Sequence, residues 1–397
     1  MSFDIALSGI QAINDQLNSV SNNIANASTY GYKSTRSNFA SMYSGSQATG
    51  VEVGSHTQSI GLNGGVVSTG NALDASINGR GFFVTRDAQN QVTYSRVGIF
   101  HVDSTGNLAD PAGHNVQGYA VNPGSTALGA LGNLKVPTGQ IPAVATTKLA
   151  YVGNMSADWT VPTVTPFNAA DDKTYNMSQL TVVLDSLGAK HTVTQYFVKD
   201  PAPGTVKSYY TFDGAALGAP TTLTFNATGQ LTAPVAPVTL AVAAPGNGAA
   251  ALSVKLDYTG TTQFAGDATT STNRPDGYAS GTYIGAELGK DGALVARYSN
   301  GLTQTVGMLA LASFADEGAL KPVDNTSWMA TNASGTALYA APGTGTSGTL
   351  STSTLEQSNV DVSSELVGLM SSQRNYQANS KVLSTENAML QSLMQAL

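Results

Sequence analysis

Apolar residues repeat every seven positions at both ends of this 397-residue chain. Near the N-terminus the repeat comprises Phe3, Ile10, Leu17 and Ile24. A second set lies three residues after these and comprises Ala6, Ile13, Val20 and Ala27. Near the C-terminus it comprises Val362, Leu369, Tyr376, Leu383, Leu390 and Leu397, joined four residues on by Leu366 and Met394. Such a repeat predicts two amphipathic helices, each with an apolar seam along one face.

Neither seam has a neighbouring segment in sequence that could cover it. Isolated helices are marginal in water, and they gain most of their stability by packing an apolar face. Ordering a residue costs about 1–2 kcal/mol of backbone entropy, whereas burying a Leu or Ile returns roughly 1.5–3 kcal/mol. A single pair of helices would leave much of each seam in water, so we expect the chain ends to assemble with the same helices of other subunits.

Two further features qualify this expectation. The middle of the C-terminal seam is polar (Gln373, Ser380 and Asn387), and such residues can fix the register between helices at some cost in stability. The alternative is that the two termini only pack on each other, as an antiparallel helical hairpin beside one globular domain.

Composition excludes several classes of partner. Only 11% of residues are charged and the net charge is −7, with no run of Lys or Arg, so a nucleic-acid partner is not expected. No apolar run is long enough to predict membrane insertion. The first residues lack the basic and apolar regions of a Sec signal peptide, so an exported chain is expected to use another route.

The chain between the seams is predicted to be mainly β. Residues 70–145 and 277–357 are expected to form an inner β domain, and residues 146–276 an outer β domain inserted into it. Within the insertion, the turn at residues 185–188 predicts a hairpin. Residues 34–69 are rich in Ser, Gly, Thr and Gln and are interpreted as a linker with some extended structure. Residues 1–33 and 358–397 complete the prediction as a helical, coiled-coil assembly domain.

No catalytic or metal-binding pattern is present in the sequence. The chain has no cysteine, and its four histidines (56, 101, 114 and 191) have no partner at metal-ligand spacing. No GxSxG elbow, phosphate-binding loop or calcium loop occurs. We therefore expect no catalytic site, no cofactor and no metal, and a protein that is not an enzyme.

Several motifs in order give a resemblance that spans the chain. Asn22, Asn23 and Asn26, followed by Gly31, Tyr32 and Lys33, resemble the N-terminal motif of the bacterial flagellar rod and hook axial family. Asn359 and Asp361, followed by Gln373, Arg374, Tyr376, Gln377 and Asn379, resemble its C-terminal motif. Residues 70–74, 81–83 and 94–98 resemble the core of its inner β domain, whereas residues 146–276 match less sharply.

The resemblance implies a self-assembling structural subunit of a hollow, bendable tube outside the cell, which transmits torque from rod to filament. It implies a homopolymer whose partners are the rod, the hook cap, the hook–filament junction proteins and the flagellar export apparatus. The size of the insertion at residues 146–276 favours the subunit of the bendable tube over the distal rod subunit, which is shorter. From other classes, a secreted adhesin would not explain the heptads, and a glycan hydrolase would need paired carboxylates that no motif supplies.

Overall fold

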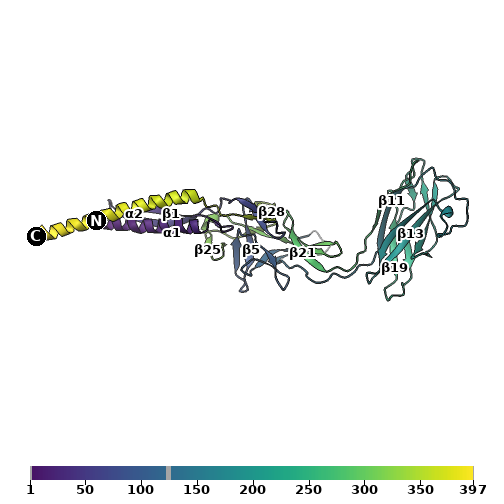
Figure 1. Ribbon diagram of the computed structural model, residues 1–397, viewed down its shortest axis with the longest axis horizontal. Coiled ribbons are helices and arrows are strands. Elements are labelled where there is room, and N and C mark those ends of the chain that lie inside the picture. Colours follow the sequence, from purple (N-terminus) through teal and green to yellow (C-terminus); the bar gives the residue numbers. More distant parts are fainter. Residues whose placement is uncertain (1, 122–126, 397) are drawn as a thin grey trace. The chain divides into compact units, whose positions relative to one another are not determined.

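The computed structural model describes residues 2–121 and 127–396, and it divides into two compact units (Figure 1). The first unit spans Met1–Thr138, Ile284–Arg297 and Thr303–Leu397. The second unit spans Gly139–Tyr283 and Tyr298–Leu302. The fold is mainly β, with a helix at each end of the chain, and this confirms the predicted fold class.

Two long helices lie in the first unit. Helix α1 is Ser2–Ala25 and has Asp4 in its first turn, where a negative charge is favourable next to the helix dipole. Helix α2 is Val362–Ala396. Asp361 caps α2, since its carboxylate accepts hydrogen bonds from the Ser363 backbone N–H (3.0 Å) and the Ser364 hydroxyl (2.7 Å). These hydrogen bonds lower the pKa of Asp361, and the one from the Ser364 hydroxyl has the largest effect.

A long β-hairpin replaces the predicted linker. Strand β1 (Thr35–Ser44) pairs antiparallel with β2 (Gln47–Gln58), and both strands contact α1. The Ser37 hydroxyl lies 2.8 Å from that of Ser19 on α1 and 3.3 Å from Nδ1 of His56. The interpretation of residues 34–69 as a linker is therefore wrong for most of this segment, because polar contacts with α1 hold strands that lack a regular apolar pattern.

The largest sheet of the first unit has thirteen strands in the described residues, and these strands come from the sequence before and after the inserted unit. Its main path is β21 (Tyr283–Leu288), β22 (Ala293–Tyr298), β23 (Thr303–Leu309), β9 (Asn115–Ala120), β5 (Phe82–Arg86), β6 (Val92–Ser95), β26 (Ser327–Met329) and β25 (Lys321–Val323). Beside this path lie β7 (His101–Val102), β8 (Leu108–Ala109), β10 (Leu131–Asn133), β24 (Leu311–Ser313) and β27 (Leu338–Ala340).

Two short ladders tie the start of the β region to its end. Strand β3 (Val66–Ser68) pairs with β29 (Thr354–Glu356), and β4 (Ala75–Asn78) pairs with β28 (Thr349–Thr352). Beneath the large sheet, Phe82, Tyr94, Phe314 and Trp328 pack edge to face or tilted in a buried aromatic cluster. The chain thus leaves this unit and returns to the same core.

The second unit packs two sheets around one core. The first sheet has the order β18 (Val238–Val242), β19 (Leu252–Asp257), β11 (Lys148–Asn154) and β20 (Thr269–Pro275). The second has the order β12 (Met177–Leu184), β13 (Lys190–Lys199), β14 (Thr205–Phe212), β16 (Thr221–Phe225) and β17 (Leu231–Ala233), with β15 (Ala215–Ala216) beside β14. Buried residues of both sheets, such as Tyr151, Phe197 and Leu256, form the core. The predicted hairpin at 185–188 is confirmed.

Candidate functional site

Helices α1 and α2 pack against each other in antiparallel register. The Asn23 amide donates to Glu365 Oε1 at 2.8 Å, and Gly368 lies beside Val20. At the other end of the pair, a Cβ on Gly9 would lie 2.9 Å from the amide nitrogen of Asn379. A glycine at position 9 therefore lets the two helices approach closely. Because α2 has 35 residues and α1 has 24, the last turns of α2 extend past α1 (Figure 1).

On α1, the predicted repeat lies largely on the buried side. Ala6, Ile13 and Val20, seven residues apart, are buried. Ile10, Leu17 and Ile24 are half-buried, and only Phe3 at the start of the repeat is exposed. The α1 seam thus packs within a single chain, against α2 and the β1–β2 hairpin.

On α2, a polar repeat faces α1. Glu365, Ser372, Asn379 and Glu386 recur every seven residues; Ser372 is buried and the other three are half-buried. The predicted register residues Gln373, Ser380 and Asn387 are exposed. The polar positions that contact α1 are therefore each one residue before the positions that were predicted to fix the register between helices.

The apolar seam of α2 remains mostly uncovered in the single chain. Leu369 and Leu383 are half-buried. The other described members are 40% to 75% exposed: Val362, Leu366, Tyr376, Leu390 and Met394. Leu397 lies outside the described residues. A stripe of exposed large apolar side chains on one helix is typical of a surface that another molecule covers.

Asn23 is the residue of the N-terminal motif that joins most elements. Its buried side chain donates to the Thr35 carbonyl at 2.9 Å as well as to Glu365. Its oxygen accepts the Thr35 backbone N–H (2.9 Å) and the Tyr32 hydroxyl (3.2 Å). One amide thus links α1, the start of the hairpin and α2. Asn26 bonds locally to Asn22, and closes the end of α1.

Lys33 lies in a buried charge cluster, which consists of Lys33, Arg96 and Glu356. Lys33 Nζ is 2.6 Å from Glu356 Oε1, and Arg96 is 3.4 Å from Glu356 Oε2. All three side chains are at most 1% exposed. Burial lowers the pKa of Lys33 and of Arg96, and the Glu356 carboxylate opposes this. A buried charge needs a paired partner, so each member depends on the others.

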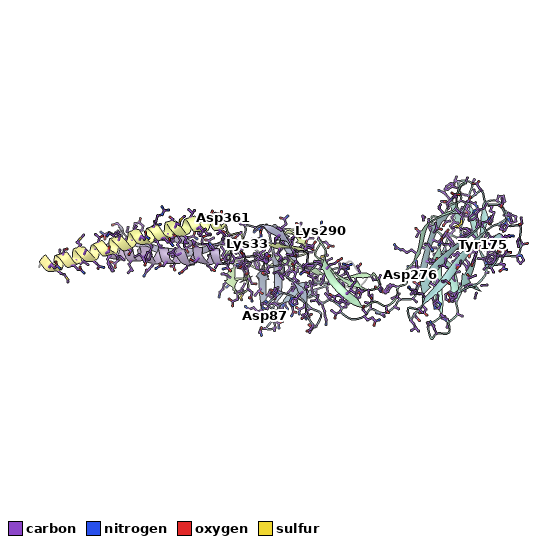
Figure 2. All side chains as sticks on the ribbon, viewed as in Figure 1. Lys33, Asp87, Tyr175, Asp276, Lys290 and Asp361 are labelled. Carbon is purple, nitrogen blue, oxygen red and sulfur yellow. The ribbon has the colours of Figure 1, made fainter. Side chains whose placement is uncertain are left out.

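The cluster is joined to the C-terminal motif through backbone contacts. Asn359 accepts the Ser34 N–H at 2.8 Å and donates to the carbonyls of Ser59 (2.9 Å) and Leu62 (3.0 Å). Lys33 also donates to the Leu62 carbonyl, at 2.6 Å. Figure 2 labels Lys33 and Asp361, which lie where the helices adjoin the strands. We call the set Asn23, Lys33, Arg96, Glu356 and Asn359 the junction.

The remaining residues of the C-terminal motif are placed differently. Gln373, Arg374, Tyr376 and Gln377 are exposed on α2, whereas Asn379 is half-buried against Gly9. The structure thus brings the N-terminal motif together with Asn359 and leaves most of the α2 motif facing outward. Arg96 was part of the resemblance, but Glu356 was not singled out. The only local signal for Glu356 was a carboxylate in a strand-like segment of a chain with few charges.

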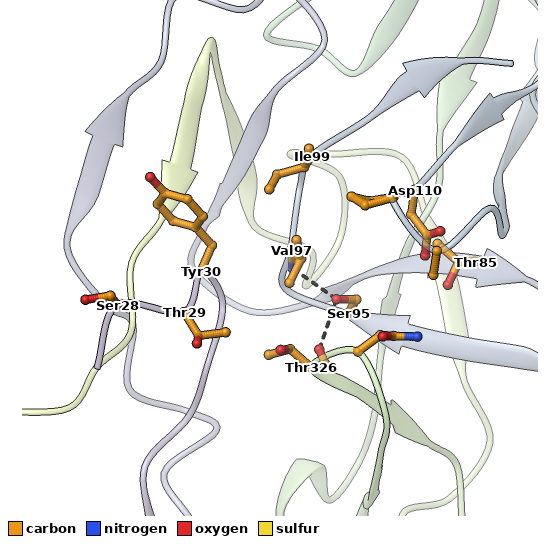
Figure 3. Close-up of a pocket in the computed structure, with 12 residues that line it drawn as sticks. Ser28, Thr29, Tyr30, Thr85, Ser95, Val97, Ile99, Asp110 and Thr326 are labelled. Carbon is orange, nitrogen blue, oxygen red and sulfur yellow. Dashed lines mark hydrogen bonds between the residues drawn. The ribbon is translucent and has the colours of Figure 1, made fainter. Parts of the chain in front are cut away.

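A pocket of about 390 Å³ lies beside the junction, between the turn at residues 28–30 and the large sheet (Figure 3). Its lining combines apolar side chains such as Val97 and Ile99 with the hydroxyl of Ser95. Ser95 donates to the Thr326 carbonyl at 3.1 Å, and the carboxylate of Asp110 is engaged by His114. Among the described lining residues, no histidine stands next to a hydroxyl as a base, so the lining offers no arrangement for nucleophilic catalysis. Across residues 2–121 and 127–396, no group of acidic, His or Cys side chains could hold a metal ion.

Gly31 provides a direct test of the junction. Its φ is +70°, and a Cβ there would lie 3.0 Å from backbone atoms of Arg96 and Val97. We expect Gly31→Ala to lower the free energy of unfolding by about 1–2 kcal/mol for the left-handed backbone, with an added cost for the contact. Gly45→Ala is the matched control, because Gly45 has φ +65° with open space around it. Urea unfolding of both variants checks this, and equal losses would contradict the steric role of Gly31.

Four family models match separate parts of the chain, the first near its start and the last near its end. "Flagella basal body rod protein" matches residues 3–33, and "Flagellar hook protein FlgE/F/G D1 domain" matches residues 76–156. "Flagellar basal body protein FlaE D2 domain" matches residues 154–278, and "Flagellar basal body rod FlgEFG protein C-terminal" matches residues 351–396. The protein is therefore of the flagellar axial class, whose members build the rod and the hook.

Similarity to curated proteins narrows the class to one family. The chain is 36% identical over 403 residues to the flagellar hook protein FlgE of Escherichia coli (strain K12), which covers 99% of each chain. It is 35% identical to that of Salmonella typhimurium (99% of each chain) and 32% identical to that of Rhizobium meliloti (98% of this chain, 97% of the other). The chain belongs to the flagellar hook protein FlgE family, which is structural and not enzymatic.

A solved structure agrees with this fold. The crystal structure of the flagellar hook protein FlgE2 of Helicobacter pylori matches 66% of this chain and 93% of its own, with a TM-score of 0.50 at 13% identity. At that identity the match bears on the fold alone. Of the helices in the described part of the chain, none has the length and apolar character needed to cross a membrane.

Proposed function

We propose that the chain is the structural subunit of the flagellar hook and polymerises through its terminal helices into a hollow, bendable tube. The observation that carries the assembly role is the apolar seam of α2, which stays exposed while the end of α1 and the start of α2 are held at the junction. Family membership supports a polymeric flagellar component. The proposed tube transmits torque from rod to filament.

Assembly follows from the energetics of the seam. Each large apolar side chain that a neighbouring copy buries contributes roughly 1.5–3 kcal/mol. Leu366, Tyr376, Leu390 and Met394 are all available for this in the single chain. We propose that the seam packs against helices of other copies as a coiled-coil layer, with Val362, Leu369, Leu383 and Leu397 in the same set. The N-terminal set (Phe3, Ile10, Ile13, Leu17, Val20 and Ile24) first packs within the chain and completes the layer.

The junction gives the tube its mechanical connection. Torque that enters through the helical layer must reach the β units, and buried hydrogen bonds between them resist relative rotation better than solvated surface pairs do. Asn23 bonds to the backbone of Thr35, and Asn359 bonds to the backbone of Ser34, the residue after Lys33 of the charge cluster. We propose that this is why Asn359 of the C-terminal motif meets the N-terminal motif.

Residues 70–145 and 277–357 would form the shell outside the helices, and residues 146–276 the outermost shell. The rod, the hook cap and the hook–filament junction proteins would contact the ends of the tube, and the export apparatus would deliver the chain outside the cell. The near-full-length match to hook relatives argues against the distal rod alternative.

Immunogold electron microscopy of detached flagella tests the proposal, with an antibody against residues 146–276. We expect gold on the curved segment between basal body and filament, since that unit would face outward. A strain whose own copy of this gene is deleted is the control for antibody specificity. Gold confined to the rod would make the chain another axial subunit. Unlabelled flagella with gold elsewhere on the cell would refute a flagellar role.

A further inference from the structure

His191 in the second unit lies between two carboxylates. Its Nδ1 is 2.7 Å from Asp213 Oδ2, and its Nε2 is 3.2 Å from Asp185 Oδ2. The ring also stacks on Phe212, with centroids 5.0 Å apart. Both ring nitrogens therefore face an oxygen that can only accept a hydrogen bond when ionised. A neutral imidazole carries one N–H, so both contacts can be satisfied together only by the imidazolium.

The three residues connect separate parts of the unit. His191 is on β13, Asp185 lies in the β12–β13 turn, and Asp213 lies in the β14–β15 turn. Asp185 Oδ2 also accepts the amide of Asn247 at 2.6 Å, from the loop that follows β18 of the other sheet. The histidine thus ties two turns of one sheet together, and Asp185 carries the connection to the second sheet.

The charged groups around the ring are few. Asp185 and Asp213 face it from the two turns, and the loop after β18 contributes only the neutral Asn247. Lys190, next to His191 in sequence, points to solvent. Hydrogen bonding to Asp213, and then to Asp185, raises the pKa of His191 against the opposing effect of burial.

The two carboxylates differ in their access to water. The Asp185 side chain is 0% exposed, whereas that of Asp213 is 45% exposed. Asp185 also accepts the backbone N–H groups of Leu187 and Ala189, and Asp213 accepts the backbone N–H and the hydroxyl of Thr192. If the ring loses a proton, one of its two contacts becomes a contact between two acceptors, so the connection through the ring between the two turns is lost whichever nitrogen keeps its hydrogen.

We propose that His191 is a proton-controlled latch, which as imidazolium ties the β14–β15 turn to the β12–β13 turn and on losing its proton loosens the β14–β15 turn, which Thr192 still holds. This turn forms one wall of a pocket of about 320 Å³, together with Val242 and Pro245 from the other sheet. Loosening of the turn widens the mouth of that pocket. The latch is fully closed below the ordinary pKa of histidine, about 6.5, and it opens as the pH rises through the raised value.

Hydrogen–deuterium exchange of the unpolymerised full-length chain tests the latch, read by mass spectrometry between about pH 6 and about pH 9. After correction for the intrinsic pH dependence of exchange, we expect protection of a peptide covering residues 209–217 to fall about tenfold or more at high pH, the loss of one charged hydrogen bond. A peptide from β19 in the core of the same unit should stay constant. Constant protection of residues 209–217 in the wild type would overturn the proposal.

Two variants separate the latch from general loosening. His191→Gln should give low protection of residues 209–217 at every pH, because Gln does not titrate. His114→Gln is the matched control, since His114 faces the single carboxylate of Asp110 at 3.1 Å and should leave the pH dependence of residues 209–217 unchanged. If His191→Gln fails to fold, Asp213→Asn replaces it and should flatten the same pH dependence. Wild-type pH dependence in either His191→Gln or Asp213→Asn would overturn the proposal.

Discussion

Leu366→Asp is expected to abolish polymerisation while leaving the chain folded. Leu366 is 46% exposed on the outward seam of α2, so a carboxylate there remains solvated in the monomer. On burial between copies the same charge would cost several kcal/mol, more than the original leucine contributed. Electron microscopy for tubes and circular dichroism for the folded monomer check the two parts of this expectation.

Ser371→Asp is the control for added charge on α2. Residue 371 is exposed and lies about 140° around the helix from both Leu366 and Tyr376, away from the seam. We expect tubes to form from this variant. Leu383→Asp and Ile13→Asp should also stop assembly, but Ile13 is buried within the chain, so Ile13→Asp should loosen the monomer's helix pair as well. Normal tubes from Leu366→Asp would show that assembly does not depend on the α2 seam.

Glu356→Gln is expected to have the largest effect on stability. The substitution leaves Lys33 and Arg96 buried without their shared carboxylate, and breaking a buried ion pair by removing one partner costs about 3–5 kcal/mol. The loss should appear in the first unit, which contains all three residues. Urea unfolding followed by Trp328 fluorescence in a Trp159→Phe background reports on that unit, since the chain has two tryptophans.

Glu287→Gln provides the comparison at the surface. Glu287 is 3.2 Å from Arg297, and both side chains are well exposed. Exposed pairs contribute at most about 1 kcal/mol because water screens them. Similar losses for Glu356→Gln and Glu287→Gln would mean that the junction is held by its backbone contacts and not by its charges.

The sequence predicted those parts of the fold whose pattern is local. The repeat through Ala6, Ile13 and Val20 identified the buried side of α1, because helical periodicity determines which residues share a face. Alternation and turn residues identified the β class and the hairpin at 185–188. These features depend on neighbouring residues, and a single sequence contains that information.

Features that depend on distant residues were missed. The β1–β2 hairpin has few periodic apolar residues, and part of its support comes from Ser37 bonding to Ser19 on α1. The charge cluster joins Lys33 to Glu356, which are 323 positions apart. The face of α2 that contacts α1 was not predicted, because the polar residues on that face repeat every seven positions without an apolar pattern to mark them. No local pattern distinguishes the half-buried Glu365 or the buried Ser372 from solvated residues of the same types.

The return of the chain to its starting point has a consequence for the order of folding. Strands β3 and β4 find their partners only in residues 349–356, so the first unit cannot close until nearly the whole chain is present. Closing such long loops is entropically costly and makes folding slow. The helix that follows these strands, α2, also carries the exposed seam. A chain synthesised only as far as residue 348 therefore lacks both the strands that close its core and the seam through which it is proposed to associate.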